Sequence, residues 1–136
     1  MKIKINHLQH IGIPVSDIEV SETFYQKLGF INATSSEFDH DGGKGKMMMM
    51  QLKDIIIELY QHPETDLGEI RSRKDGHIDH ITFDVSDIDQ TYSVLKEASF
   101  HVLEEQPVFL PFWEKGCKYF NILGPDGERL EFNQIL

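Results

Sequence analysis

The sequence predicts an α+β fold made of two tandem copies of one βαβββ module, and three observations support it. When the chain is shifted so that His7 falls on His77, HLQHIGIPVSDIEVSETFYQKLGF aligns with HIDHITFDVSDIDQTYSVLKEASF, so that His-x-x-His and Val-Ser-Asp-Ile recur. A second repeat sets IELYQ at residues 57–61 against LEFNQ at 130–134. In both copies, alternating apolar residues are followed by helical spacing and then by three strand-like stretches.

The start of each module has the signals of a strand followed by a helix. An alternating apolar segment predicts a half-buried strand. Ser16 with Glu19, and Ser86 with Asp89, have the spacing of a capping box, which predicts a helix start. Apolar residues then fall on one helical face, and Gly29 is expected to end the first helix.

The rest of each module reads as short strands joined by turns. Strands are expected at residues 30–38, 45–52 and 54–61, and again at 100–105, 116–123 and 128–135. Gly42-Gly43 and the GPDG sequence at 124–127 are typical hairpin turns. Residues 62–76 are polar without a clear period and indicate a linker. We therefore expect one domain over residues 1–136, with module one at about 5–61 and module two at about 77–136.

Four polar residues lie on the face of their strands that should turn away from the helix. Successive side chains of a strand point to opposite faces, so His10 and His80 oppose the apolar residues that follow them, and Glu131 opposes its apolar neighbours. Glu58 interrupts the apolar run DIIIELY, and a buried carboxylate needs a strong partner.

These two imidazoles and two carboxylates would converge on one divalent metal ion if the modules pair about a pseudo-twofold axis. Mixed nitrogen and oxygen ligands suit Ni²⁺, Zn²⁺, Co²⁺, Fe²⁺ or Mn²⁺. The alternative is that duplication left equivalent residues without a function. His7 and His77 also repeat, but they lie three residues from the expected ligands and so on the other strand face, which favours a structural role.

Composition excludes several classes of protein. The 136 residues include 13 Lys and Arg against 23 Asp and Glu, a net charge of −10 that disfavours nucleic acid and anionic membranes as partners. No apolar run approaches the roughly 20 residues of a spanning helix, and MKIKINHLQH lacks the features of a signal peptide, so we expect a cytoplasmic protein. The single Cys117 excludes an internal disulfide, and packing is its favoured role.

Two apolar segments are candidates for a substrate pocket. In the run KMMMMQL, alternation turns two methionines toward the cavity, and Met48 and Met50 are the candidates, although core filling is the favoured alternative. Phe109, Phe112 and Trp113 lie in a proline-containing loop that is a candidate lid or pocket wall, with packing in a dimer interface as the alternative.

The motifs HIGIPVSDIEVSETFYQKLGF, IIIELYQ, GHIDHITFDVSDID and GPDGERLEFNQ together resemble the vicinal oxygen chelate superfamily, within it the glyoxalase I (lactoylglutathione lyase) branch, over essentially the whole chain. The resemblance implies a curved mixed sheet around one metal ion held by His10, Glu58, His80 and Glu131. Nickel, cobalt or zinc are the metals it favours. It also implies a homodimer whose sites form within one chain or between subunits.

The resemblance implies a metal-dependent lyase or isomerase that converts a methylglyoxal hemithioacetal to an S-2-hydroxyacyl thiol through an enediolate. Glu131 is expected to move the proton, with Glu58 as its counterpart. Relatives that use glutathione often carry arginine and asparagine where this chain has Pro14 and His62, so the thiol is open. Other members of the superfamily, an epimerase, a thiol transferase, a dioxygenase or a non-catalytic drug-binding resistance protein, are the alternatives.

Overall fold

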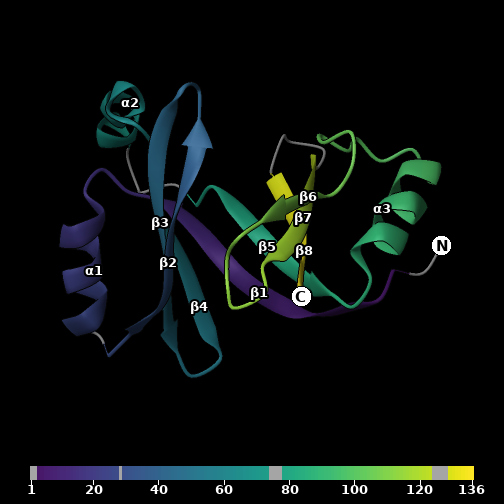
Figure 1. The fold of residues 1–136 in the computed structure, drawn as a ribbon, viewed down its shortest axis with the longest axis horizontal. Coiled ribbons are helices and arrows are strands. Elements are labelled where there is room, and N and C mark those ends of the chain that lie inside the picture. The colour runs from purple at the N-terminus through teal and green to yellow at the C-terminus, as the bar shows by residue number, and fades with distance from the viewer. Residues whose placement is uncertain (1–2, 28, 74–77, 124–128) are drawn as a thin grey trace. The chain divides into compact units, whose positions relative to one another are not determined.

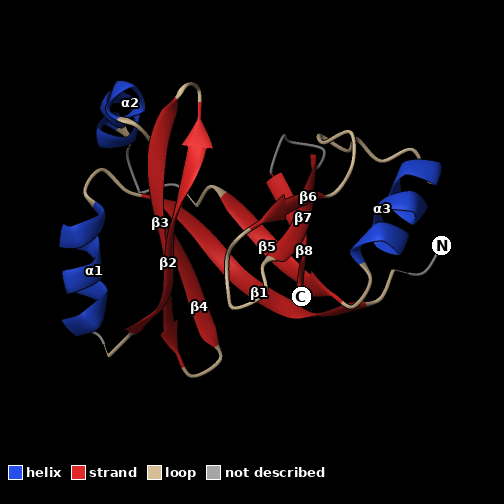
Figure 2. Cartoon of the chain, viewed as in Figure 1, coloured by secondary structure: helices blue, strands red, loops and turns tan. Residues whose placement is uncertain are grey.

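The structure is a computed structural model that describes residues 3–27, 29–73, 78–123 and 129–136 (Figures 1 and 2). The chain divides into two compact units. One, His10–Asp79, is here called the first unit, and the other, Met1–Gln9 with His80–Leu136, is called the second unit. The element order β1-α1-β2-β3-β4 and then β5-α3-β6-β7-β8 confirms an α+β fold of two βαβββ modules.

The first unit carries a mixed sheet whose strand order is β2-β3-β4-β1. Strand β1 pairs in parallel with β4, and β3 pairs antiparallel with both β2 and β4. The elements are β1 (Ile5–Pro14), α1 (Ile18–Lys27), β2 (Ile31–His40), β3 (Gly43–Leu52), β4 (Ile55–Gln61), the short 3₁₀ helix η1 (Glu64–Asp66) and α2 (Leu67–Ser72). Strand β1 continues from the second unit, to which its first residues belong.

The second unit repeats the pattern, with strand order β5-β8-β7-β6. Here β5 pairs in parallel with β8, and β7 pairs antiparallel with β8 and β6. The elements are β5 (His80–Val85), α3 (Ile88–Glu97), β6 (Val108–Leu110), β7 (Cys117–Leu123) and β8 (Arg129–Ile135). The parallel pair in each unit joins the first and last strands of one module, as a duplicated βαβββ unit requires.

Helix α1 packs on the sheet of the first unit and α3 on that of the second, and each buries an apolar core there. In the first unit the buried core residues are Ile18, Phe30, Met50 and Leu59. In the second unit they are Val85, Ile88, Leu95, Phe120, Ile122 and Phe132. The rings of Phe120 and Phe132 stack with centroids 5.3 Å apart.

Helices α1 and α3 begin in the same way. In both, the N-cap residue lies one position after the serine that the capping-box spacing predicted. Asp87, not Ser86, is the N-cap of α3, and its carboxylate accepts a hydrogen bond from Gln90 N at 2.9 Å. Asp17 caps α1 likewise and accepts from Glu19 N at 3.1 Å. A carboxylate is the stronger acceptor for exposed helix N–H groups and is also favoured by the helix dipole.

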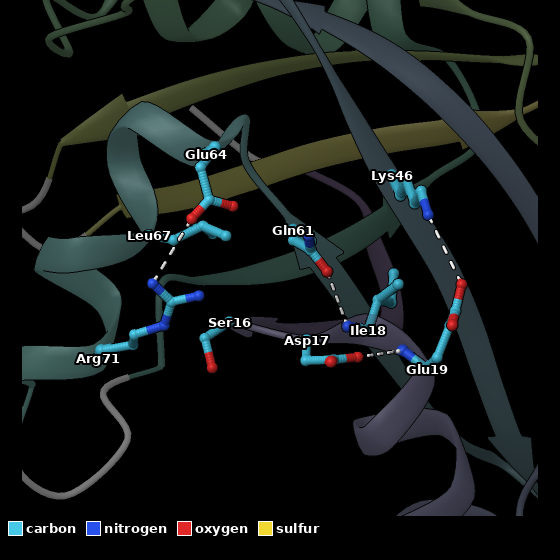
Figure 3. Close-up of a pocket in the computed structure, with 9 residues that line it drawn as sticks. All are labelled: Ser16, Asp17, Ile18, Glu19, Lys46, Gln61, Glu64, Leu67 and Arg71. Atoms are coloured by element: carbon cyan, nitrogen blue, oxygen red, sulfur yellow. Dashed lines mark hydrogen bonds and ion pairs between the residues drawn. The ribbon is translucent and has the colours of Figure 1, made fainter.

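A glutamine at the end of each module's last strand completes the helix start. Gln61 Oε1 accepts a hydrogen bond from Ile18 N at 2.8 Å, and Figure 3 shows its side chain turned toward the first turn of α1. Gln134 Oε1 accepts from Ile88 N at 3.0 Å in the second unit. The repeat IELYQ and LEFNQ therefore ends on a residue with the same structural task in both modules.

The strand expected at 100–105 does not form, and this prediction was wrong. Within that stretch Val102 makes only an isolated bridge to Ile122, and the edge strand of the second module is β6, further along the chain. The reason lies in Glu104, whose carboxylate accepts from both Asn121 N at 2.6 Å and Asn121 Nδ2 at 2.8 Å. The Glu104 side chain therefore accepts from the backbone N–H of Asn121, a donor that a regular neighbouring strand would have bonded through its own backbone.

The segment expected to be a polar linker also differs, because it contains η1 and α2. Leu67, only 1% exposed, anchors it on the first unit. Sequence analysis did not predict this short helix, because one buried leucine does not produce a helical period. Residues 74–77 and the GPDG turn at 124–127 lie outside the described residues. No helix among the described residues is long and apolar enough to cross a membrane.

Candidate metal centre

In the first unit, His10 and Glu58 form a closely spaced pair on the sheet. His10 Nε2 lies 3.2 Å from Glu58 Oε2, and the His10 side chain is only 2% exposed. Glu58 pairs with Gly12 across the parallel β1–β4 ladder, two residues along β1 from His10.

In the second unit, His80 and Glu131 form the equivalent pair. His80 Nε2 lies 3.8 Å from Glu131 Oε2, and both side chains are largely buried, at 7% and 12% exposure. Glu131 is matched with Thr82 across the parallel β5–β8 ladder, so it stands to His80 as Glu58 stands to His10. Strand alternation is the reason that sequence reasoning could find these residues on one face.

Glu131 is held by a chain of amide side chains. Asn133 Nδ2 donates to Glu131 Oε1 at 3.1 Å, and Gln9 Nε2 donates to Asn133 Oδ1 at 3.2 Å. The same Gln9 amide lies 3.4 Å from Asp84 Oδ1. Sequence reasoning missed the role of Gln9 and Asn133, although Asn133 has the parity of Glu131 in its strand and is a polar residue in an apolar strand.

Met48 and Met50, the two methionines that are candidates for the substrate pocket, lie on the helix-covered face of their strand. Met50 is fully buried in the core under α1, and Met48 packs against that core, so neither shares a face with Glu58. Met49 does, because it is the antiparallel partner of Glu58 in the β3–β4 ladder, and Met47 has the same parity. Counting alternation along one strand does not reveal which set faces the helix. The positions of Met48 and Met50 agree with core filling, the favoured alternative, and Met47 and Met49 are the two that share the face of Glu58.

The aromatic segment after β6 is divided between core and surface. Phe109 belongs to β6 and is 55% exposed, with its ring over Gly116. Phe112 is buried, at 5% exposure. Trp113 has a positive φ of 70°, and its buried Nε1 has no hydrogen-bond partner among the described residues. A buried indole N–H is a donor that a bound molecule could satisfy.

The remaining residues singled out in the sequence lie apart from these pairs or outside the description. His7 has a largely exposed side chain, with Nδ1 3.8 Å from Asp84 Oδ2, and His77 is outside the described residues. Cys117 is buried, and its Sγ lies 3.7 Å from Asn133 Nδ2, so it packs beneath the amide that holds Glu131.

Residues 7–132 match the Glyoxalase/Bleomycin resistance protein/Dioxygenase superfamily. The chain belongs to this superfamily. It is also called the vicinal oxygen chelate superfamily, and most of its members are enzymes that use a divalent metal ion.

Two kinds of relative of this glyoxalase-superfamily chain are informative. YwbC of Bacillus subtilis (strain 168), an uncharacterized protein, is 31% identical over 131 residues, covering 93% of this chain and 96% of the relative. The structure of methylmalonyl-CoA epimerase from Mycobacterium tuberculosis matches with a TM-score of 0.79 at 18% identity, covering 100% of this chain and 92% of the epimerase. A variant of 4-hydroxymandelate synthase from Streptomyces coelicolor matches with a TM-score of 0.73 at 15% identity, covering 94% of this chain and 48% of the synthase. At these identities the two structures show the superfamily's fold and not a shared activity.

Proposed function

We propose that His10, Glu58, His80 and Glu131 together bind one divalent metal ion and that the protein is a metal-dependent lyase or isomerase of the glyoxalase I type. The observation that carries the proposal is the pair of buried imidazole–carboxylate contacts at duplicated positions, 3.2 Å and 3.8 Å between nitrogen and oxygen. Two ligands that each lie about 2.1 Å from the same zinc ion are themselves roughly 3.0 to 3.4 Å apart, from octahedral to tetrahedral geometry, so small side-chain shifts would let each pair of donor atoms share a cation.

The proposed reaction moves a proton between adjacent carbons of a 2-oxoaldehyde hemithioacetal to yield an S-2-hydroxyacyl thiol. A bound ion would supply Lewis-acid stabilisation of the charge that develops on the substrate oxygens. Glu131 is the proposed base. Asn133 Nδ2 donates to its Oε1, which fixes the orientation of the carboxylate that would take the proton and return it to the neighbouring carbon. Glu58 is its proposed counterpart from the first unit.

Neighbouring side chains support a small substrate with both apolar and polar parts. Met47 and Met49 share the face of Glu58 and would provide an adaptable apolar wall. On the face of Glu131, Asn121 is only 5% exposed, and its Oδ1 accepts no hydrogen bond from the described residues. A substrate hydroxyl or amide N–H would satisfy that oxygen. Phe109, Phe112 and Trp113 remain the proposed outer wall of the pocket.

The first test is metal content together with turnover. Purified protein without an affinity tag is expected to hold a stoichiometric divalent ion at this centre, and His10→Ala and Glu131→Gln are each expected to lose that ion or bind it much more weakly. Metal-reconstituted protein is then assayed with methylglyoxal and glutathione, bacillithiol, coenzyme A or cysteine. Failure with every thiol would reject the glyoxalase reaction, and stable, metal-free native protein would favour a drug-binding protein.

An epimerase is the second candidate, because the structure of methylmalonyl-CoA epimerase covers the whole chain. Epimerisation next to a thioester carbonyl needs the same elements, a bound ion and carboxylates that remove and return one proton. Solvent deuterium exchange into methylmalonyl-CoA tests it. Exchange that depends on Glu131, without methylglyoxal turnover, would move the proposal from lyase to epimerase.

The two halves of the proposed site meet either within one chain or across a homodimer, and subunit mixing decides between them. His10→Ala and Glu131→Gln proteins, each inactive alone, are unfolded together and refolded as a mixture. A site shared between subunits predicts recovery of about one quarter of the wild-type activity, because half of the dimers are mixed and each mixed dimer has one intact site. Sites within one chain predict no recovery.

A further inference from the structure

Three metal-binding side chains that have no part in the proposed reaction gather at one end of the first unit. His40 is the last residue of β2, His62 directly follows β4, and Asp66 ends η1. One donor atom of each lies within 4.8 Å of those of the other two. His40 Nε2 is 3.0 Å from Asp66 Oδ2, and His62 Nδ1 is 3.7 Å from the same oxygen.

Backbone packing brings these segments together independently of the imidazoles. The β2–β3 hairpin turns through Asp41 and Gly42, both with positive φ, of 45° and 77°. A side chain on Gly43 would place its Cβ 2.8 Å from Pro63 Cγ, so this glycine lets the chain beyond β4 pass against the hairpin. Leu67, 1% exposed, then fixes the following helix. The cluster therefore rests on a rigid frame, which lowers the ordering cost of binding.

The arrangement of the two imidazoles favours a cation between them and the carboxylates. The rings of His40 and His62 stack with centroids 4.2 Å apart and an angle of 23° between planes. A second carboxylate, that of Asp41, lies with Oδ2 3.4 Å from His40 Nε2. Imidazole nitrogens with carboxylate oxygens suit Zn²⁺, Ni²⁺ or Cu²⁺ better than Mg²⁺ or Ca²⁺.

The geometry points to a second metal site, in which His40, His62 and Asp66 bind a divalent transition-metal ion. The three residues line a cavity of about 330 Å³, which leaves room for water ligands. Stacked rings must turn for both nitrogens to point at one ion. That rotation is about the Cβ–Cγ bond, whose preference is broad, and the side chains are 32% and 24% exposed, so they have space to turn.

Other charges around the cavity do not oppose this assignment. Arg73 and Glu69 also line it, but they pair with each other, with Nε 2.8 Å from Oε1. That hydrogen bond raises the pKa of Arg73 above its ordinary value, and the paired charges of Arg73 and Glu69 offset each other beside the cluster. The site shares no residue with the metal centre proposed above, and its inference does not rest on that proposal.

The decisive measurement is Zn²⁺ binding to untagged protein, by competition with a chromophoric chelator. In a His10→Ala/Glu58→Gln background, in which the proposed catalytic centre is disabled, one equivalent of Zn²⁺ is expected to bind. Adding His40→Ala and His62→Ala should abolish it. His101→Ala, which removes an exposed histidine elsewhere, is the matched control and should change nothing. Binding that survives the His40 and His62 changes, or no binding in the background protein, would overturn the assignment.

Two further measurements keep the result interpretable if the background variant is unstable. In otherwise wild-type protein, His40→Ala/His62→Ala should lower the Zn²⁺ stoichiometry from two equivalents to one, and unchanged stoichiometry rejects the site. One equivalent in the wild type, lost in this variant, would support the cluster and reject the catalytic centre. Asp66→Asn keeps the side-chain shape and should weaken binding by about tenfold or more. Equal affinity would exclude Asp66 as a ligand and overturn the three-residue site.

Discussion

Glu58 and Glu131 occupy equivalent positions in the two modules, yet their neighbours differ in chemistry. Across its two ladders Glu58 is matched with Gly12 and Met49, neither of which has a side-chain hydrogen-bond donor. His10 Nε2 lies 3.2 Å from this carboxylate.

Glu131 is matched instead with Thr82 and Asn121, and Asn133 donates directly to it. Duplication preserved the histidine and the glutamate of each half while the surrounding residues diverged. The two carboxylates therefore have different surroundings. Asn133 donates a hydrogen bond to Glu131, which suits that carboxylate to accept a proton at a defined point, whereas the cross-strand neighbours of Glu58 include no side-chain donor.

The strongest test of this comparison is to neutralise each carboxylate separately. Glu131→Gln is expected to lower kcat by about 10²- to 10⁴-fold, because it removes the proposed base. Glu58→Gln should lower kcat less at saturating metal, since an amide oxygen still offers a ligand. Both variants are assayed after reconstitution, with bound metal measured in each sample. Equal losses at equal occupancy would break the distinction between the two glutamates.

Removing the support of Glu131 should have a smaller effect. Asn133→Ala deletes the donor at 3.1 Å and is expected to lower kcat by about 10- to 100-fold, the usual range for residues that orient a ligand. As a positioning residue, Asn133 should alter kcat with little change in the thermal unfolding midpoint. Asn133→Gln is the conservative control, and partial rescue by it is expected. A loss explained fully by lower stability would contradict the positioning role.

The cross-strand neighbours give a matched pair of substitutions to leucine. Asn121→Leu removes a side-chain donor to Glu104, and leaving that carboxylate less satisfied should cost about 1–3 kcal/mol of unfolding free energy. Met49→Leu nearly conserves volume in an apolar site and should cost less than about 1.5 kcal/mol. Urea unfolding measures both. A larger cost for Met49→Leu would indicate that the surroundings of Glu58 are not the permissive ones described here.

The two glutamines at the helix starts have the same contact in both modules. Removing them should have the smallest effect on the free energy of unfolding. Gln61→Ala and Gln134→Ala each remove an acceptor from the first turn of a helix, at 2.8 Å and 3.0 Å. Each is expected to cost about 1 kcal/mol. Gln51→Ala, a substitution of a glutamine in β3 that caps no helix, is the control. Costs that differ strongly between the two caps would mean that the repeat is less symmetric in energy than in geometry.

Much of the architecture was accessible from the sequence because the duplication shows each signal twice. The repeated Val-Ser-Asp-Ile marked both helix starts to within one residue, but the choice between Ser86 and Asp87 as N-cap depends on backbone geometry at a single residue. The expected strand at 100–105 failed because the Glu104 side chain takes the backbone donor of Asn121, an interaction between residues well separated along the chain. Local propensity does not contain such a contact.

By itself the sequence determined the two modules, their helices and the strand parity of His10, Glu58, His80 and Glu131, because these follow from local periodicity repeated in two copies. Only the tertiary structure decided which methionines share a face with Glu58, that Asn133 holds Glu131, and that His40 meets His62 and Asp66. Those facts depend on strand register and on packing between segments that are distant in the chain. Neither strand register nor packing between distant segments produces a repeating pattern in the sequence, because each is fixed by one or two contacts.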